Sequence, residues 1–255
     1  MQRVHVRLKQ SCLVIMLGLV VVSAPSFAQQ NTPAETLAPA TGAPPVEQQP
    51  SSAPKRPEVL DLGAGRILVG NIVVDKELGE FRVPGRMLKL DTATAPIEFL
   101  AAARSGDKGY ESALELDVSA FEFNLACILI GLTENAKSQP YAHFDPKPVE
   151  GDPVDIRVSW RLDGRLHDRP VGDLIKLSTG TREPDEWSYT GSAFNENGSY
   201  RAQVWGTLIG VVHDPDSIIH HRTGLGLNDY GAVIINHDVA PPPDTRIVLT
   251  VRRGS

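Results

Sequence analysis

The order of apolar and polar residues along the chain predicts mostly strands. In residues 154–162 every second residue is apolar, from Val154 to Leu162, and such alternation is typical of a strand with one buried and one exposed face. Asp163-Gly164 follows directly and favours a type I′ hairpin turn, which needs positive φ at both positions. Other apolar or alternating runs predict strands at residues 66–74, 80–83, 97–101, 110–116, 187–189, 200–212, 232–236 and 245–251.

Glycine and proline mark the expected ends and weak points of these strands. Pro84-Gly85 is expected to end the strand at 80–83. Gly206 and Gly210 should weaken the long strand at 200–212 or form bulges in it. Residues 195–198 read as a turn, and residues 173–177 fit either a strand or a short helix.

One segment has the pattern of a helix. Ser119 and Glu122 match a capping box, in which each side chain bonds the backbone amide of the other residue. The run that follows, to Leu132, is apolar on almost all sides and predicts a buried helix. With about ten strands, the chain is expected to be mainly β or α+β, with antiparallel sheet or sheets and one buried helix (about 119–132) packed on a face.

The first 28 residues have the pattern of a secretory signal peptide. Three basic residues precede an apolar run from Cys12 to Val22, and Ser26-Phe27-Ala28 supplies small residues at a cleavage site. The run is too short to span a bilayer, so we expect no membrane span after the signal is removed. The expected location is the periplasm, the cell surface or the outside of the cell. The pattern leaves open whether the segment is cleaved or kept as an anchor.

A polar, proline-rich segment follows the leader. Residues 29–57 contain seven prolines in 29 positions and no aromatic residue. Such a composition cannot bury enough apolar surface to offset the entropy of ordering, which predicts a disordered, semi-extended tether. Residues 58–255 then form a single globular domain of a usual size.

The charge balance limits the partners. The leader holds three basic residues and no acidic ones, so its removal leaves 22 basic and 31 acidic residues and a net charge of −9. Nucleic acid and anionic membranes both bind basic surfaces, so neither is expected as a main partner of this acidic chain. The expected partner is an envelope ligand or protein that the sequence does not identify. No cofactor is implied, although a divalent metal ion is allowed.

One cysteine remains after removal of the leader. Cys127 lies in the apolar run 125–130 and is expected to be a buried small hydrophobe rather than a reactive thiol. A single thiol cannot form an internal disulfide, so packing alone must stabilise the core. The three tryptophans, Trp160, Trp187 and Trp205, are expected to pack in the core or on a sheet face rather than to form a carbohydrate platform.

Histidine and aspartate are dense near the end of the chain. His213, His220, His221 and His237 are candidate metal ligands, together with neighbouring aspartates. The spacing matches no helical ligand pair, and adjacent histidines on a strand would point to opposite faces. The sequence Asp214-Pro215-Asp216 also favours a turn, which needs no bound metal. Loop residues whose side chains are satisfied by hydrogen bonds or face the solvent are therefore the favoured interpretation, with a metal site as the alternative.

A second candidate site lies earlier in the chain. Glu98 interrupts the apolar run 97–101, so its carboxylate must be exposed or paired. Lys108 and Glu111 flank the start of the next strand. If these two strands pair, both glutamates could converge around Lys108, and paired carboxylates with shifted pKa values can serve as general acids or bases. A structural ion pair is the favoured alternative.

Other catalytic signatures are incomplete. Gly191-Ser192-Ala193-Phe194 lacks the second glycine of a nucleophile elbow. Gly63-Ala64-Gly65 and Gly224-Leu225-Gly226 do not open a helix, so they are poor candidates for binding nucleotide phosphates.

Several short motifs, in order along the chain, resemble the YdjY-like domain of exported bacterial proteins. They are Phe81-Arg82-Val83-Pro84-Gly85-Arg86, Pro96-Ile97-Glu98-Phe99-Leu100, Lys108-Gly109-Tyr110-Glu111-Ser112 with the apolar helix, and residues 187–194. The resemblance covers roughly residues 66–236. The family has no established activity, so it implies no catalytic residues. It does draw attention to Glu98, Lys108, Glu111 and Ser112, where the match concentrates without a packing reason.

These observations favour a non-enzymatic binding or interaction domain held on a tether in the cell envelope. One alternative is a metal-binding protein or metal-dependent enzyme that uses the late histidines. Another is a metal-free enzyme centred on Glu98, Lys108 and Glu111.

Overall fold

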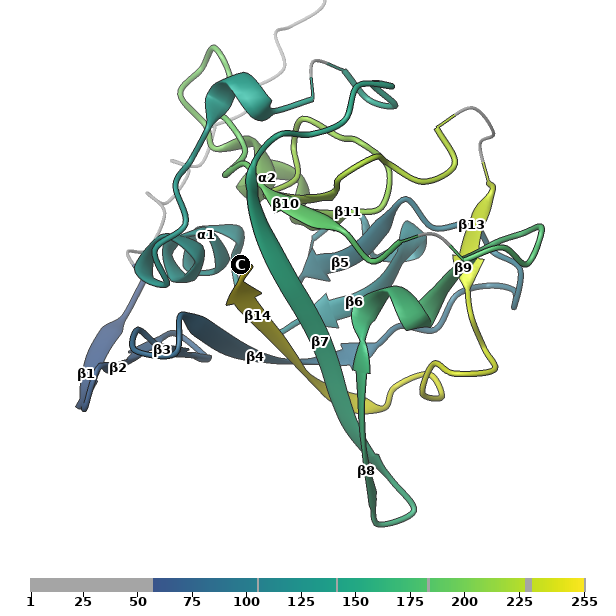
Figure 1. The fold of residues 1–255 in the computed structure, drawn as a ribbon, viewed down its shortest axis with the longest axis horizontal. Coiled ribbons are helices and arrows are strands. Elements are labelled where there is room, and N and C mark those ends of the chain that lie inside the picture. Colours follow the sequence, from purple (N-terminus) through teal and green to yellow (C-terminus); the bar gives the residue numbers. More distant parts are fainter. Residues whose placement is uncertain (1–56, 105, 141, 183, 228–230, 255) are drawn as a thin grey trace, which may run out of the picture. The chain divides into compact units, whose positions relative to one another are not determined.

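The fold is taken from a computed structural model, which describes residues 57–104, 106–140, 142–182, 184–227 and 231–254 (Figure 1). The predicted signal peptide at residues 1–28 and residues 29–56 of the predicted tether lie outside the described residues.

Within the described residues, eight strands form a closed barrel. Each strand is hydrogen-bonded to the next, and the last, β6, returns to the first, β4. The order around the ring is β4 (Glu80–Met87), β14 (Arg246–Arg253), β7 (Asp152–Leu162), β10 (Trp187–Tyr189), β12 (Ile219–His221), β11 (Thr207–Gly210), β5 (Phe99–Ala103) and β6 (Ser112–Leu116). The pairs β11–β12 and β5–β6 are parallel and the others antiparallel. The predicted mainly β fold is confirmed.

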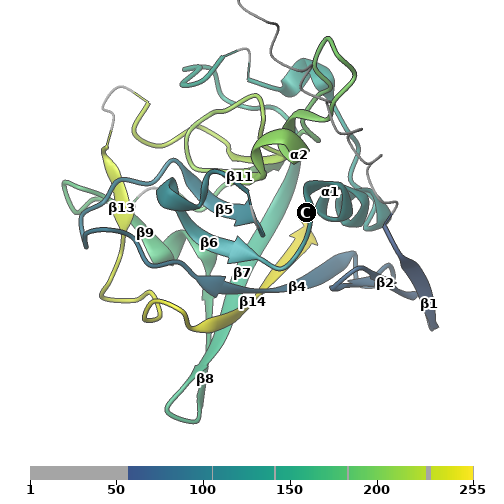
Figure 2. The same ribbon diagram turned by 180° about the vertical axis from the view of Figure 1, so that it is seen from behind.

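Further strands extend this barrel. Three of them form a meander that joins the edge of β4: β1 (Val59–Gly63), β2 (Arg66–Val69) and β3 (Ile72–Asp75). Strand β8 (Arg165–Pro170) pairs with β7 and makes a hairpin that projects from the barrel in both views (Figures 1 and 2). Strands β9 (Ile175–Leu177) and β13 (Val233–Ile235) form a separate two-stranded sheet.

The predicted helix is present as α1 (Ala120–Leu129). Its capping box is formed: the Glu122 amide donates to the Ser119 hydroxyl at 3.3 Å, and the Ser119 amide donates to the Glu122 carboxylate at 2.7 Å. Phe123 packs edge-on against Phe81 of the barrel, with ring centroids 5.3 Å apart. The helix ends three residues earlier than expected and leaves Ile128 exposed, so it is buried on one face rather than all round.

Four shorter helices complete the described structure. They are η1 (Gly109–Glu111), η2 (Ala136–Ser138), η3 (Val171–Leu174) and α2 (Arg201–Trp205). Residues 173–177, expected to be strand or helix, contain the end of η3 and the whole of β9.

The expected strand at residues 200–212 is wrong. Residues Arg201–Trp205 form α2, which ends at Gly206 in the left-handed conformation with φ 75°. Strand β11 begins only after this glycine. Apolar runs of this length fit a helix or a strand equally well, and a left-handed glycine is a common helix end. The sequence shows the glycine at position 206, but it does not show that this glycine adopts the left-handed conformation that ends the helix.

Two other strand boundaries also differ from the prediction. Residues 66–74 form two strands, separated by a turn at Gly70 with φ 55°. Pro84-Gly85 does not end its strand, and β4 continues to Met87. At Gly85 a Cβ atom would lie 2.4 Å from the backbone oxygen of Glu115 on β6. The glycine therefore permits the close approach of β4 and β6 that closes the barrel.

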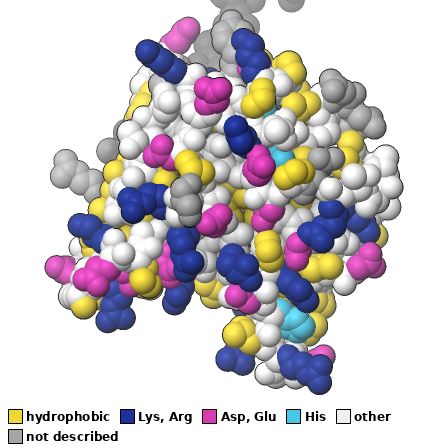
Figure 3. Space-filling model, viewed as in Figure 1, with side chains coloured by type: hydrophobic (Ala, Val, Ile, Leu, Met, Phe, Trp, Pro, Cys, Tyr) yellow, Lys and Arg dark blue, Asp and Glu magenta, His cyan; other side chains and the backbone are white. Residues whose placement is uncertain are grey.

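The predicted hairpin at β7–β8 is confirmed, with positive φ at both Asp163 and Gly164. Inward-facing residues of β4, β7 and β14 fill the core, and Cys127 is fully buried against it. Burial raises the pKa of the Cys127 thiol well above its usual value. Among the residues that the structure describes, no helix has both the length and the apolar character needed to cross a membrane. Acidic and basic side chains are interspersed over the face shown in Figure 3.

Candidate functional site

Parallel pairing of β5 and β6 brings Glu98 and Glu111 together. Glu98 directly precedes β5, and its amide donates to the backbone oxygen of Glu111 at 3.0 Å. On its other side, the Glu98 carbonyl accepts from the amides of Val211 and Val212 after β11. Both glutamates are buried, with relative exposures of 8% and 7%. The two carboxylates are thus held by backbone hydrogen bonds at one end of the barrel.

Lys108 pairs with the second of these glutamates. Its Nζ lies 2.6 Å from Glu111 Oε1 and 5.7 Å from the ring centroids of both Phe99 and Tyr110. Burial lowers the pKa of Lys108, but the hydrogen bond and charge of Glu111 raise it by more, so the net shift is upward. Ser112, the other candidate here, donates its hydroxyl to the Lys108 carbonyl at 2.7 Å. Ser112 therefore fixes the loop that carries the lysine.

A histidine that was not among the sequence candidates joins this cluster. His143 Nε2 lies 3.1 Å from Glu98 Oε2, and its Nδ1 lies 3.9 Å from Asp214 Oδ2. The hydrogen bond with Glu98 is the main reason that the pKa of His143 is raised, with the charge of Asp214 adding to it. Burial raises the pKa of Asp214 itself. The imidazole is thus held between two carboxylates and favours its charged form.

The loop 213–217 positions the other acidic partners. Asp214 Oδ1 accepts from the Asp216 amide at 2.9 Å and its backbone oxygen accepts from the Ser217 amide at 3.0 Å, which is the turn that the Asp-Pro-Asp sequence favours. Asp216 in turn accepts a hydrogen bond from Arg201 of α2. The turn therefore presents one carboxylate to His143 and another to Arg201.

Several of these groups line a pocket of about 440 Å³, which we call the His143 pocket. Its lining residues are Lys108, Ala142, His143, Arg201, Trp205, Asp214, Pro215 and Asp216. The volume is within the range of about 300–1,000 Å³ that is usual for ligand sites. Trp205 is 44% exposed there, whereas Trp160 and Trp187 are buried as expected. The expected packing of Trp205 on a sheet is wrong, because this residue ends α2.

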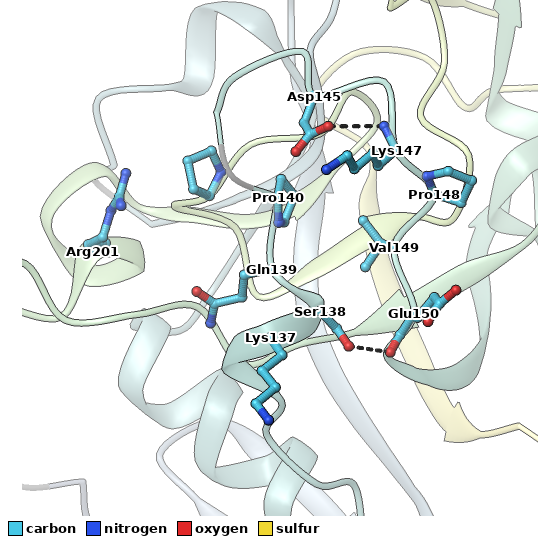
Figure 4. Close-up of a pocket in the computed structure, with 11 residues that line it drawn as sticks. Lys137, Ser138, Gln139, Pro140, Asp145, Lys147, Pro148, Val149, Glu150 and Arg201 are labelled. Carbon is cyan, nitrogen blue, oxygen red and sulfur yellow. Dashed lines mark hydrogen bonds between the residues drawn. The ribbon is translucent and has the colours of Figure 1, made fainter.

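A second pocket adjoins it, and a third adjoins the second. The middle pocket, of about 820 Å³, is lined by Lys137, Ser138, Gln139, Pro140, Asp145, Lys147, Pro148, Val149, Glu150, Arg201 and Pro215 (Figure 4). The far pocket, of about 480 Å³, is lined by Val149, Glu150, Gly151, Pro153, Val154, Asp155, Asp185, Glu186, Trp187, Ser188 and Arg222.

The four late histidines do not converge. His213 contacts the backbone oxygens of Asp145 and His221, at 2.5 and 3.0 Å. His221 Nε2 donates to the Pro184 carbonyl at 2.7 Å, and His237 Nε2 to the Ala93 carbonyl at 3.0 Å. Each of these three rings is thus engaged by backbone oxygen.

Like His213, His220 is fully buried. Its Nε2 lies 3.1 Å from the Thr190 hydroxyl, and its ring centroid is 6.4 Å from that of His213. Burial, together with His213, lowers the pKa of His220 to about 3. In the described part of the chain no three His, Cys, Asp or Glu side chains are arranged to hold a metal ion. The His143 cluster, formed by Glu98, Lys108, Glu111, His143 and Asp214, fits this finding, since Glu98 and Asp214 approach opposite nitrogens of the imidazole.

Sequence reasoning placed Glu98, Lys108 and Glu111 in one cluster but missed His143, Asp214 as its partner, and the Arg201–Asp216 pair. His143 lies in the proline-rich connection before β7, where no periodic pattern marks a side chain. The structure does show one unusual feature beside it: Phe144 has φ 59°, an uncommon conformation for a bulky residue. This feature could not be seen in the sequence.

Comparison with known proteins gives a family and no individual relative. Neither the curated proteins nor the solved structures that were searched contain a match. Residues 72–252 match the YdjY domain, which extends the expected resemblance from residue 236 to the end of the barrel. The match spans β3 to β14 and includes every residue of the His143 cluster. The chain therefore belongs to the YdjY domain family.

Proposed function

We propose that this chain is an exported binding protein whose barrel domain holds a neutral, hydroxyl-rich ligand, such as a saccharide, in the His143 pocket. One observation carries the proposal: the exposed indole of Trp205 and a set of paired charged side chains line the same pocket. An apolar surface beside convergent polar groups is the usual composition of a small-molecule site.

The pairing of charges favours a neutral ligand. Lys108 is paired with Glu111 and Arg201 with Asp216, while His143 lies between two carboxylates. With each cation already neutralised by an acid, the pocket offers no excess positive charge to an anion. It offers donors and acceptors side by side instead. Hydroxyl groups both donate and accept hydrogen bonds, so a polyol can satisfy both kinds of partner.

Trp205 adds an apolar contact. Sugar rings carry one face of C–H groups, and such a face packs against an aromatic ring. Trp205 is 44% exposed and lies beside Arg201 on the same short helix. A ring stacked on this indole would therefore meet the guanidinium and its carboxylate partner at its edge.

Tryptophan fluorescence tests the proposal directly. The chain has three tryptophans; Trp205 lines the His143 pocket and the buried Trp187 borders the far pocket, so the Trp205→Phe variant is needed to assign a change in emission to Trp205. We expect at least one of cellohexaose, maltohexaose and chitohexaose to shift the emission saturably. Trp205→Ala should weaken binding about tenfold by calorimetry, whereas Trp205→Phe should retain binding and lose the spectral change.

A matched control is available on the projecting hairpin. Leu166 of β8 is exposed and lies outside the residues that line the three pockets, so Leu166→Ala should bind as the wild type does. The proposal fails if none of the three probes binds, or if Trp205→Ala binds each of them with wild-type affinity.

Export is the second part of the proposal. It rests on the basic and apolar pattern of residues 1–28 and on the single cysteine left after their removal. Protein recovered from the exported fraction of the producing bacterium should begin at Gln29 by N-terminal sequencing. A chain found in the cytosol with its leading residues intact contradicts this part and leaves the ligand proposal standing.

A second candidate function is metal-free acid–base catalysis at the same cluster. It is favoured by the hydrogen bond between Glu98 and His143 and by the raised pKa of the imidazole, since histidine near neutrality transfers protons effectively. If the protein is an enzyme, chromatography of an incubated hexasaccharide should show shorter products, and His143→Gln should abolish them while binding remains. Intact substrate after prolonged incubation rejects catalysis and leaves binding in place.

A further inference from the structure

We infer that the His143 pocket is one end of a continuous groove, and that the groove takes a linear chain of sugar units rather than a single small molecule. The inference rests on the proposed function and adds the shape of the ligand. Its basis is that three pockets follow one another and share lining residues.

The pockets connect at both ends of the middle one. The His143 pocket and the middle pocket share Arg201 and Pro215, and the middle and far pockets share Val149 and Glu150. In Figure 4 Arg201 lies on one side of the middle pocket, and Val149 and Glu150 lie on the opposite side. The middle pocket thus spans the distance between its two neighbours. A ligand that filled all three would lie along the segment formed by residues 137–140 and 142–151.

Hydrogen bonds hold this segment to the barrel. The Val149 amide donates to the Arg222 carbonyl at 2.8 Å and the Gln139 side chain to the Ser192 carbonyl, while the Ser138 hydroxyl donates to the Glu150 carbonyl within the segment itself. Gly151 is held so closely that a Cβ atom would lie 2.0 Å from the Tyr189 backbone oxygen. The groove wall is therefore formed before any ligand arrives, which reduces the entropic cost of binding.

The charges along the groove do not suit a polyanion or a polycation. The middle pocket combines Lys137, Lys147 and Arg201 with Asp145 and Glu150. In the far pocket four acids, Glu150, Asp155, Asp185 and Glu186, accompany Arg222. A chain with one sign of charge would meet like charges in at least one pocket. A neutral chain of hydroxyl-bearing units meets donors and acceptors throughout.

An extended peptide fits less well. Peptides that lie along sheets gain affinity by hydrogen bonding to a free strand edge. The strands that flank the far pocket, β7 and β10, are each paired on both sides, β7 with β14 and β10, and β10 with β7 and β12. Among the described residues, the groove therefore offers no free strand edge beyond Asp155 and Ile156, which lie between the parts of β7 that pair with β10 and with β8.

A length series tests the inference. With the full mature chain, we expect cellohexaose, maltohexaose or chitohexaose to bind at least tenfold more tightly than the disaccharide of the same series. The variant Glu150→Ala/Arg222→Ala removes side chains from the middle and far pockets and leaves the His143 pocket intact. It should weaken hexasaccharide binding about tenfold, as expected for lost hydrogen bonds to charged groups, and leave disaccharide binding unchanged. Leu166→Ala is again the control.

The outcomes separate this inference from the proposed function. If no saccharide of any length binds, the proposed function fails. If a disaccharide and its hexasaccharide bind equally and the double variant binds both as the wild type does, the groove is wrong and the saccharide pocket stands. Should the double variant prove unstable, Lys137→Ala removes one exposed groove side chain. This variant must then weaken binding of the hexasaccharide and leave binding of the disaccharide unchanged. Any other result rejects the groove.

Discussion

Among single residues, His143 and His220 illustrate how surroundings give the same side chain opposite charge states. The hydrogen bond of His143 with Glu98 raises its pKa, and the nearby Asp214 adds to the effect. His220 is fully buried, and burial lowers its pKa to about 3. Near neutral pH the first ring is drawn toward its charged form and the second stays neutral. The contributions of these two residues to stability should therefore depend on pH with opposite sign.

For His143 the folded-state pKa lies above its ordinary value of 6.5. The stabilisation it gives is present in full below that value and is lost as the pH rises through the raised pKa. An NMR titration should place the pKa of His143 above 6.5 in the wild type and lower in Glu98→Gln, because that variant removes the hydrogen-bonded charge. Asp168→Asn, on the distant hairpin strand β8, should leave it unchanged. Equal values in the wild type and Glu98→Gln would refute the assigned cause.

For His220 the sign is reversed. In the unfolded chain the His220 imidazole is protonated near pH 6.5, whereas in the folded chain it stays neutral down to about pH 3. Stability should therefore fall as the pH drops below 6.5, by about 1.4 kcal/mol per pH unit from this residue. Urea unfolding at several pH values should show that slope reduced in His220→Gln and kept in His237→Gln. An unchanged slope in His220→Gln would assign the acid sensitivity to other groups.

At the scale of elements, the sequence predicted best where the signal was local. The capping box of Ser119 and Glu122 and the hairpin turn at Asp163-Gly164 need only neighbouring residues, and both are formed. The region 200–212 was assigned wrongly because its apolar run suits either type of element, and contact with a distant segment decides between them. His143 was missed for a related reason: it lies in a connection, where a side chain gains its role only from partners far along the chain.

Gly206 allows a test of this distant contact. Its φ is 75°, and a Cβ atom there would lie 2.5 Å from the Cα of Gly106. Gly198 has the same φ of 75° with nothing within 4 Å of a Cβ atom, so it isolates the backbone strain. Gly198→Ala should cost about 1–2 kcal/mol, and Gly206→Ala should cost a further 1–3 kcal/mol, roughly, from overpacking. Chemical denaturation measures both. If both variants lose the same stability, the close approach of Gly206 to Gly106 does not contribute to the cost of the substitution.

At the scale of the whole molecule, closure of the barrel assembles the site. Glu98, Lys108, His143 and Asp214 come from four separate segments, which the pairing of β5 with both β6 and β11 helps to gather at one end. Alternation along a strand says which face is buried but not which strand is its neighbour. The mainly β class could therefore be predicted from the sequence, whereas the ring order and the complete cluster could not.

The closing pair β4–β6 gives the last prediction. Gly85 allows β4 to approach β6, where a Cβ atom would lie 2.4 Å from the Glu115 backbone oxygen, and the adjacent Arg86 bonds the Glu115 carboxylate across the pair at 3.0 Å. Gly85→Ala should push the strands apart, lower stability by about 1–3 kcal/mol, and speed hydrogen exchange of the β6 amides.

Gly109→Ala is the matched control for this change, since its nearest contact would be Leu88 Cδ1 at 3.9 Å. Because β6 follows directly on Glu111, the partner of Lys108, loosening of β6 should also weaken ligand binding in the His143 pocket. Wild-type exchange rates in Gly85→Ala would show that the barrel tolerates a side chain at its closing pair. Closure would then be independent of this glycine, and the geometry of the cluster would have to depend on β5 and β11 instead.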